Sequence, residues 1–139
     1  LLKAFNVQKR FFHFEFFRPK GGDGLTALEV NMRPPGGLTT DMFNYACDID
    51  IYRAWACIVS GREFPYPGYT HKYYCCYASR KSNRAYAHGE GKILAKFGEK
   101  FRHREAISGV FRGALGDQGF IFRTTELEEV SQIARFIQE

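Results

Sequence analysis

Two strand-like runs, rich in aromatic and apolar residues and joined by a glycine-rich segment, constrain the fold of this chain more than any other feature. The first run is RFFHFEFF at 10–17, the second is LTALEVNM at 25–32, and RPKGGDG lies between them. Short aromatic, apolar and β-branched runs around a Pro-, Gly- and Asp-rich segment are typical of a β-hairpin. Residues 34–37 then read Pro-Pro-Gly-Gly, which ends the second strand. We therefore predict an antiparallel hairpin with a sharp exit.

The register of this hairpin follows from its apolar residues. Placing Glu15 opposite Glu29 gathers the apolar side chains on one face, because side chains alternate with period two. That face is expected to bury Phe12, Phe14, Phe16, Leu28, Val30 and Met32. The other face then carries His13, Glu15, Glu29, Asn31 and Arg33.

The polar face is a candidate cation site. Two carboxylates placed directly opposite one another repel unless a positive charge lies between them. Glu15, Glu29 and the amide oxygen of Asn31 are hard oxygen ligands, which suit Mg²⁺ or Mn²⁺ shared with nucleotide phosphates. Arg33 could bind a phosphoryl oxygen or a carboxylate in bidentate fashion. The alternative is a solvated outer face on which Arg33 pairs with a glutamate.

The segment after the hairpin predicts one long helix. Apolar residues recur at three- and four-residue steps over 38–61, and Gly61 can end the helix. The buried stripe is expected at Leu38, Met42, Tyr45, Ile49, Tyr52 and Ala56. The free N–H groups at the start of this helix form a ready anion site. Asp41 in its first turn is either a site residue or a complement to the helix dipole.

The rest of the chain predicts a mixed α+β fold, with antiparallel strands and packed helices. The expected elements are a strand at 71–79, a helix at 89–100, strands at 105–112 and 119–123, and a helix at 126–138. Residues 1–9 read as the end of a helix. The last helix is expected to be capped by Thr124 or Thr125 and to face inward at Leu127, Val130, Ile133, Ala134 and Ile137.

The hairpin resembles the metal-binding hairpin of the ATP-grasp superfamily. That signature is an acidic residue on one strand, Glu-x-Asn about a dozen residues later, and often an Arg two residues beyond the Asn. FHFEFF followed by ALEVNMRPPGG matches it at Glu15, Glu29, Asn31 and Arg33. The Arg-bearing version is similar to biotin carboxylase and carbamoyl phosphate synthetase. The longer run EVNMRPPGGLTTDMFNYACDIDIY most resembles the carboxylate–amine ligase-like branch.

The resemblance implies an activity and its cofactors. It implies an ATP- and Mg²⁺-dependent (or Mn²⁺-dependent) carboxylate–amine ligase, or a carboxylate–thiol or carboxylase-type relative, that forms an acyl phosphate. Glu15, Glu29 and Asn31 would hold two metal ions at the ATP phosphates, with Glu29 bridging both. Arg33 would be the catalytic residue that steadies the transferring group or the substrate carboxylate.

The resemblance also implies a missing part. ATP-grasp enzymes close ATP between two lobes, and the phosphate-binding lysine, the flexible glycine-rich loop and the adenine pocket belong to the lobe that this chain lacks. KGGDG at 20–24 has the composition of a plain turn. Gly36 and Gly37 would let backbone amides approach the anion closely. The resemblance covers roughly residues 10–60, and the segment 114–137 resembles the small C-terminal module of these enzymes more loosely.

We accordingly expect the C-terminal lobe of an ATP-grasp fold, excised from a longer protein and inactive alone. Residues 1–61 would carry the hairpin and the long helix, and 62–139 a small sheet-and-helix module, the two forming either separate or continuous domains. The expected partners are the missing N-terminal lobe, small carboxylate and amine substrates, and a second copy in a homo-oligomer.

Cysteine usage and hydropathy predict a cytoplasmic protein. The four cysteines have no metal-type spacing and are expected to be packed thiols in a reducing compartment. No apolar run approaches the roughly 20 residues that span a bilayer.

A basic region supports a second, non-catalytic hypothesis. Residues 71–104 contain nine Lys or Arg against two Glu, a local excess of +7 in a chain of net charge +5. Tyrosines interleaved with cations can bind single-stranded nucleic acid or another polyanion by stacking and phosphate contacts. The region could instead dock against the absent lobe or a second subunit. The nucleic-acid hypothesis leaves Glu15 and Glu29 unexplained, so we rank it below the ligase.

Overall fold

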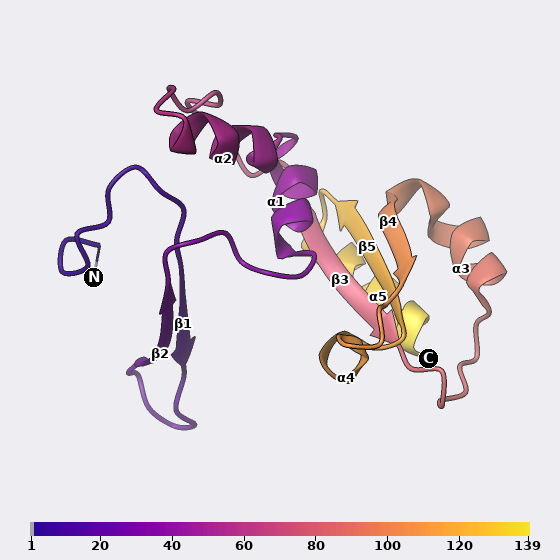
Figure 1. The fold of residues 1–139 in the computed structure, drawn as a ribbon. Helices are drawn as coiled ribbons and strands as arrows, with labels where there is room; N and C mark the ends of the chain where they lie inside the picture. Colours follow the sequence, from indigo (N-terminus) through magenta and orange to yellow (C-terminus); the bar gives the residue numbers. More distant parts are fainter. Residues whose placement is uncertain (1) are drawn as a thin grey trace. The chain divides into compact units, whose positions relative to one another are not determined.

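The predicted hairpin is present in the computed structural model, which describes residues 2–139 (Figure 1). Strand β1 (His13–Phe17) pairs antiparallel with β2 (Thr26–Asn31), and Glu15 lies opposite Glu29 as predicted. A β-bulge follows this pair, so that Phe16 pairs with Ala27 and Leu28 has no partner across the ladder.

The bulge and the exposure of the hairpin correct one part of the prediction. The apolar face is not buried as expected: Phe16 is 38% exposed and Leu28 is 55% exposed. Phe12 is also exposed, and its ring contacts that of Phe14 at a centroid distance of 5.1 Å. The alternating pattern therefore predicts which side chains share a face, but it does not predict that another layer of the protein covers that face.

The chain is an α+β fold that divides into two compact units. One unit contains the residues up to Asp41 together with Asp50–Gly68, and the other contains Met42–Ile49 together with Tyr69–Glu139. The elements after the hairpin are α1 (Thr39–Cys47), α2 (Ile51–Val59), β3 (Tyr74–Arg80), α3 (Glu90–Phe97), the 3-10 turn η1 (Gly98–Lys100), β4 (Phe101–Ala106), α4 (Arg112–Leu115), β5 (Gln118–Thr124) and α5 (Leu127–Gln138).

The single long helix predicted over 38–61 is wrong, because α1 and α2 are separate helices. Asp48 has a left-handed backbone with φ of 52°, which interrupts the helix. Asp50 then caps α2, since its side chain accepts a hydrogen bond from the N–H of Arg53 at 2.9 Å. Because of the break, the buried residues of α2 differ from those predicted for one continuous helix. Tyr52, which was expected to be buried, is exposed, whereas Ala54 is fully buried.

Gly61 ends α2 as predicted. Its φ of 73° lies in the left-handed region, which a glycine adopts without a Cβ penalty. The N–H of Gly61 donates to the carbonyl of Ile58 at 3.2 Å, and the N–H of Arg62 donates to the carbonyl of Cys57 at 2.8 Å. This pair of hydrogen bonds is a Schellman motif, which satisfies carbonyls left open at the helix end.

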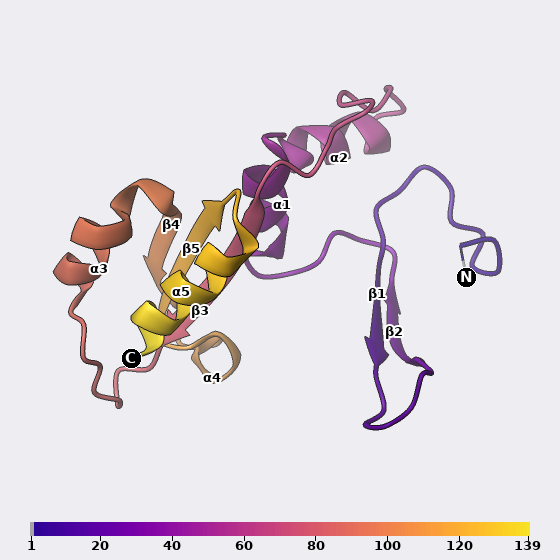
Figure 2. The same cartoon turned by 180° about the vertical axis from the view of Figure 1, so that it is seen from behind.

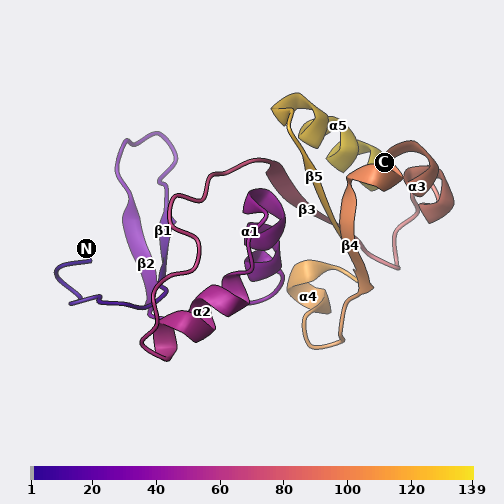
Figure 3. The same cartoon turned by 90° about the horizontal axis from the view of Figure 1, so that it is seen from above.

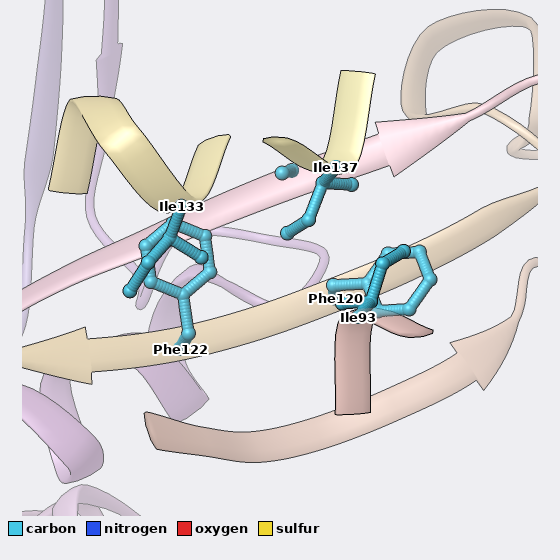
Figure 4. Packing of buried hydrophobic residues seen from close by; sticks show 6 residues of the cluster. Ile93, Phe120, Phe122, Ile133 and Ile137 are labelled. Atoms are coloured by element: carbon cyan, nitrogen blue, oxygen red, sulfur yellow. The ribbon is translucent and has the colours of Figure 1, made fainter. Parts of the chain in front are cut away.

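The second unit is built on an antiparallel sheet of order β3-β5-β4, with α5 packed across it (Figures 2 and 3). The central strand β5 is almost entirely buried, and Phe120 and Phe122 point to the same face. Figure 4 shows these rings against Ile133 and Ile137 of α5 and against Ile93 of α3. This cluster is the hydrophobic core of the unit.

Several element boundaries in this unit differ from the predictions. The strand expected at 105–112 runs instead over Phe101–Ala106, and part of the expected range forms α4. The expected inward position of Leu127 is wrong, because this side chain is 61% exposed. The N-cap of α5 is Glu126 with no side-chain cap, although Thr124 Oγ1 accepts from the Glu126 N–H at 3.2 Å.

The N-terminal segment forms turns rather than the end of a helix. Over residues 2–9 the backbone turns, with left-handed φ values of 48° at Asn6 and 43° at Lys9. Leu1 lies outside the described residues. No helix within residues 2–139 is long and apolar enough to cross a membrane.

Candidate functional site

Four polar side chains form a block on one face of the hairpin. Glu15 pairs with Glu29, and two residues away along both strands His13 pairs with Asn31. Because alternate residues share a face, both pairs lie on the same side of the two strands. Directly opposed residues such as Glu15 and Glu29 have Cβ atoms roughly 5 Å apart, and Asn31 is two residues from Glu29 along the same face.

His13 is hydrogen-bonded on both ring nitrogens. Its Nδ1 lies 3.1 Å from the carbonyl oxygen of Arg33, and its Nε2 lies 2.9 Å from Asn31 Nδ2. A carbonyl only accepts, so Nδ1 carries the hydrogen, and in the neutral ring Nε2 accepts from the Asn31 amide. The Asn31 amide nitrogen is thereby engaged with His13, and its oxygen is left for another partner.

Both carboxylates are exposed, and neither pairs with a Lys or Arg side chain within residues 2–139. The side chain of Glu15 is 50% exposed, and its Oε1 lies 3.8 Å from His13 Nε2. Glu29 is exposed and has no ion pair with Lys, Arg or His anywhere in the described part of the chain. Like charges on directly opposed strand residues destabilise the pairing, and a cation between them would offset this repulsion.

Arg33 and the two predicted glycines lie in the turn between β2 and α1. Arg33 Nη1 donates to the carbonyl of Pro34 at 3.0 Å, and no ion pair joins Arg33 to a glutamate within residues 2–139. The face itself is solvated, as the alternative expected, because Glu15, Glu29 and Arg33 are all exposed. A Cβ added at Gly36 would lie 4.0 Å from Arg33 Nη1. Gly37 has a φ of 62°, a left-handed conformation that favours glycine.

The start of α1 is held by side-chain hydrogen bonds. Thr40 Oγ1 donates to the carbonyl of Pro35 at 3.0 Å, which ties the helix to the turn before it. Asp41 in the first turn accepts a hydrogen bond from the hydroxyl of Tyr52 at 3.0 Å. That contact gives Asp41 a structural partner in addition to its favourable position at the helix N-terminus.

The donor set of the hairpin fits a metal ion that is shared with phosphates. Among residues 2–139, no group of three or more His, Cys, Asp or Glu side chains is arranged to hold a metal by itself. The hairpin offers two carboxylates and one amide oxygen. Mg²⁺ is typically bound through one or two carboxylates together with water and substrate phosphates rather than by a closed protein cage.

The basic region is largely satisfied by contacts within its own unit. Lys72 pairs with Asp48 at 3.3 Å and Lys100 pairs with Glu129 at 2.9 Å, while Arg104 forms an ion pair with Glu90. Arg80 is only 8% exposed and donates to the carbonyls of Ile137 and His88. Lys81, Arg84 and Lys92 have no such partners in the described residues.

A hollow of about 570 Å³ lies elsewhere in the first unit. It is lined by apolar residues of the N-terminal segment and of the end of α2 and the loop after it, and its charged lining residues are Lys9, Arg10, Arg62 and Glu63. Glu15, Glu29 and Asn31 are not among its lining residues.

Comparison with protein-family models, curated proteins and solved structures gives no match to this chain. The interpretation of the site therefore depends on the hairpin motif and on the contacts described above.

Proposed function

We propose that this chain is the C-terminal portion of an ATP-grasp carboxylate–amine ligase-like enzyme, and that its hairpin binds the metal ions at the ATP phosphates. One observation carries the proposal: Glu15 and Glu29 are directly paired, and Asn31 lies one pair further along the same face. The motif requires this arrangement of the three side chains. The arrangement depends on the pairing register of the two strands and does not follow from sequence spacing alone.

The chemistry of the side chains supports the same assignment. When bound, Mg²⁺ supplies charge neutralisation at the phosphates and polarises the phosphoryl group that moves to a carboxylate. Glu15, Glu29 and the oxygen of Asn31 would bind the metal, and Arg33 would orient the transferring group or the substrate carboxylate. The N–H groups after Gly36 and Gly37 would add neutral donors for the same anion.

The polyanion-binding alternative receives less support. Most of the cations that suggested it are paired with carboxylates, hydrogen-bonded to carbonyls or placed over aromatic rings. Tyr73, one of the tyrosines expected to stack with bases, instead lies under Arg123 at 4.0 Å from the guanidinium carbon. A stacking platform needs free ring faces.

The proposal is tested by ATP turnover in the longer protein that would supply the missing lobe. Turnover should require Mg²⁺ and a carboxylate together with an amine, and the 139-residue chain alone should show none. Glu29→Gln should lower kcat by about 100-fold or more, since removal of one electrostatic contact to the transition state commonly costs that much.

The matched control is Glu128→Gln, which makes the same change at an exposed position on α5. It should leave turnover unchanged. Turnover that is unaffected by Glu29→Gln, or that does not depend on a divalent metal, would overturn the proposal.

A further inference from the structure

We propose that His13 is a positioning residue of the metal site, because it holds the Asn31 side chain with its amide nitrogen engaged and its oxygen available for a cation. This inference rests on the proposed function. It concerns a residue outside the four that the motif contributes, and it follows from two contacts: Nδ1 to the Arg33 carbonyl at 3.1 Å and Nε2 to Asn31 Nδ2 at 2.9 Å.

An asparagine is a metal ligand only through its oxygen, so its orientation matters. The two ends of the amide differ by a rotation of about 180° around one bond, and the wrong rotamer would present N–H donors to a cation. The carbonyl of Arg33 selects the tautomer of His13 with hydrogen on Nδ1. That tautomer leaves Nε2 as an acceptor, which selects the orientation of the amide in turn.

The surroundings of His13 allow this role. Its side chain is only 18% exposed, so water competes poorly for Nε2. Glu15 Oε1, the other group near Nε2, lies 3.8 Å away, which is beyond hydrogen-bond distance, so it does not take the place of the Asn31 amide. The carbonyl of Arg33, two residues past the end of β2, engages the other ring nitrogen, so both partners of the imidazole lie on the segment that carries Asn31 and the turn.

The first test is spectroscopic and needs no bound metal. In the intact chain with ¹⁵N-labelled histidine and asparagine, the ring nitrogen shifts of His13 at neutral pH should be those of the Nδ1–H tautomer. A scalar coupling should be detectable through the hydrogen bond between His13 Nε2 and Asn31 Nδ2. The opposite tautomer, or a coupling that is absent while the hairpin is folded, would overturn the inference.

The second test uses Mn²⁺ as the probe and measures its affinity from the broadening of hairpin amide signals. His13→Ala should weaken Mn²⁺ binding by about 10- to 100-fold, as is typical when the group that orients a ligand is removed. His13→Gln retains a donor and an acceptor and should recover most of the affinity. Thr26→Ala, at the other end of β2, is the matched hairpin control and should change nothing.

A double-mutant cycle separates orientation from general support of the hairpin. The carboxylate created by Asn31→Asp has two equivalent oxygens and needs no orientation. In that background His13→Ala should cost less than about twofold in Mn²⁺ affinity. An equal loss in both backgrounds would overturn the inference, because His13 would then act only by holding the strands together.

The outcomes distinguish this inference from the proposed function. Mn²⁺ binding that requires Glu15 and Glu29 but ignores His13 would overturn the inference alone. Wild-type chain that binds no Mn²⁺, with or without a nucleotide triphosphate, would overturn the metal site and with it the role of His13 toward a metal.

Discussion

Arg123 on β5 forms an ion pair with Asp48, the left-handed residue that ends α1. The same guanidinium donates to the carbonyl of Tyr45 at 2.7 Å and lies over the ring of Tyr73. The end of α1 is therefore fixed to the central strand of its own unit through one arginine. Hydrogen bonds from Arg123 and Lys72 lower the pKa of the Asp48 carboxyl, with Arg123 contributing most.

This ion pair predicts an acid-dependent loss of stability. A carboxyl whose pKa is lower in the folded state stabilises the fold above its unfolded pKa, about 4, and loses that contribution as pH falls through the folded value. Asp48→Asn should lower the free energy of unfolding at pH 7 by on the order of 0.5 to 1 kcal/mol, because the pair is partly exposed and screened. The difference from wild type should shrink below pH about 4.

Urea denaturation at a series of pH values checks this prediction. Asparagine tolerates the left-handed backbone at position 48, so the substitution tests charge rather than strain. Asp23→Asn in the exposed hairpin turn is the charge-matched control and should show no comparable dependence. A wild-type advantage that is constant from pH 7 to pH 2 would contradict the assignment.

The core of the second unit predicts a contrast along α5. Ile133 is fully buried against the β5 phenylalanines, whereas Leu127 on the same helix is 61% exposed. Ile133→Ala should lower the free energy of unfolding by about 2 to 5 kcal/mol, through lost burial and a residual cavity. Leu127→Ala should change it by less than about 0.5 kcal/mol. Circular dichroism during denaturation measures both, and similar losses would contradict the described helix face.

The Schellman motif at the end of α2 predicts a cost for adding a side chain at Gly61. Gly61→Ala forces an L residue into a φ of 73° and should cost about 1 to 2 kcal/mol. Gly61→Asn should cost less, because asparagine adopts this conformation more readily. Trp55 lies on α2 and is the single tryptophan, so its fluorescence reports this unfolding. Equal stability of the Ala and Asn variants would argue against a backbone origin.

Burial predicts a slow reaction for Cys75. Desolvation raises the pKa of its thiol to about 11, and the neighbouring Cys76 adds to the shift. The thiolate is the reactive form, so at pH 8 the folded chain should alkylate at Cys75 about 100-fold more slowly than the denatured chain. Iodoacetamide labelling followed by peptide mass spectrometry measures the rates. A native rate within threefold of the denatured rate would contradict the described burial.

The sequence was most informative where local pattern and tertiary structure agree. Alternation around a glycine-rich turn predicted β1, β2 and the pairing of Glu15 with Glu29, because register depends on turn length and face. The apolar stripe of α5 likewise identified Ile133 and Ile137, because a three-to-four-residue period survives in an amphipathic helix.

The misplaced elements have identifiable physical causes. Apolar periodicity continues across the break before α2, and the signal for it lies in two aspartates. Asp48 tolerates the left-handed backbone, and the Asp50 side chain accepts from the N–H of Arg53 and so caps α2. Strand β4 was shifted because FRHREA is polar: it is an edge strand, and most of its residues are exposed. The contacts of His13 depend on its tautomer and on a backbone carbonyl 20 residues away, which no residue pattern specifies.

The β-bulge between Glu15 and Phe16 divides the hairpin into two segments with different registers. The paired carboxylates lie on the side that joins the rest of the unit, and the long turn lies on the other. A bulge absorbs a one-residue offset locally. A one-residue change in the turn can therefore be taken up at the bulge without shifting Glu15 relative to Glu29, so we expect this loop to tolerate a single insertion or deletion.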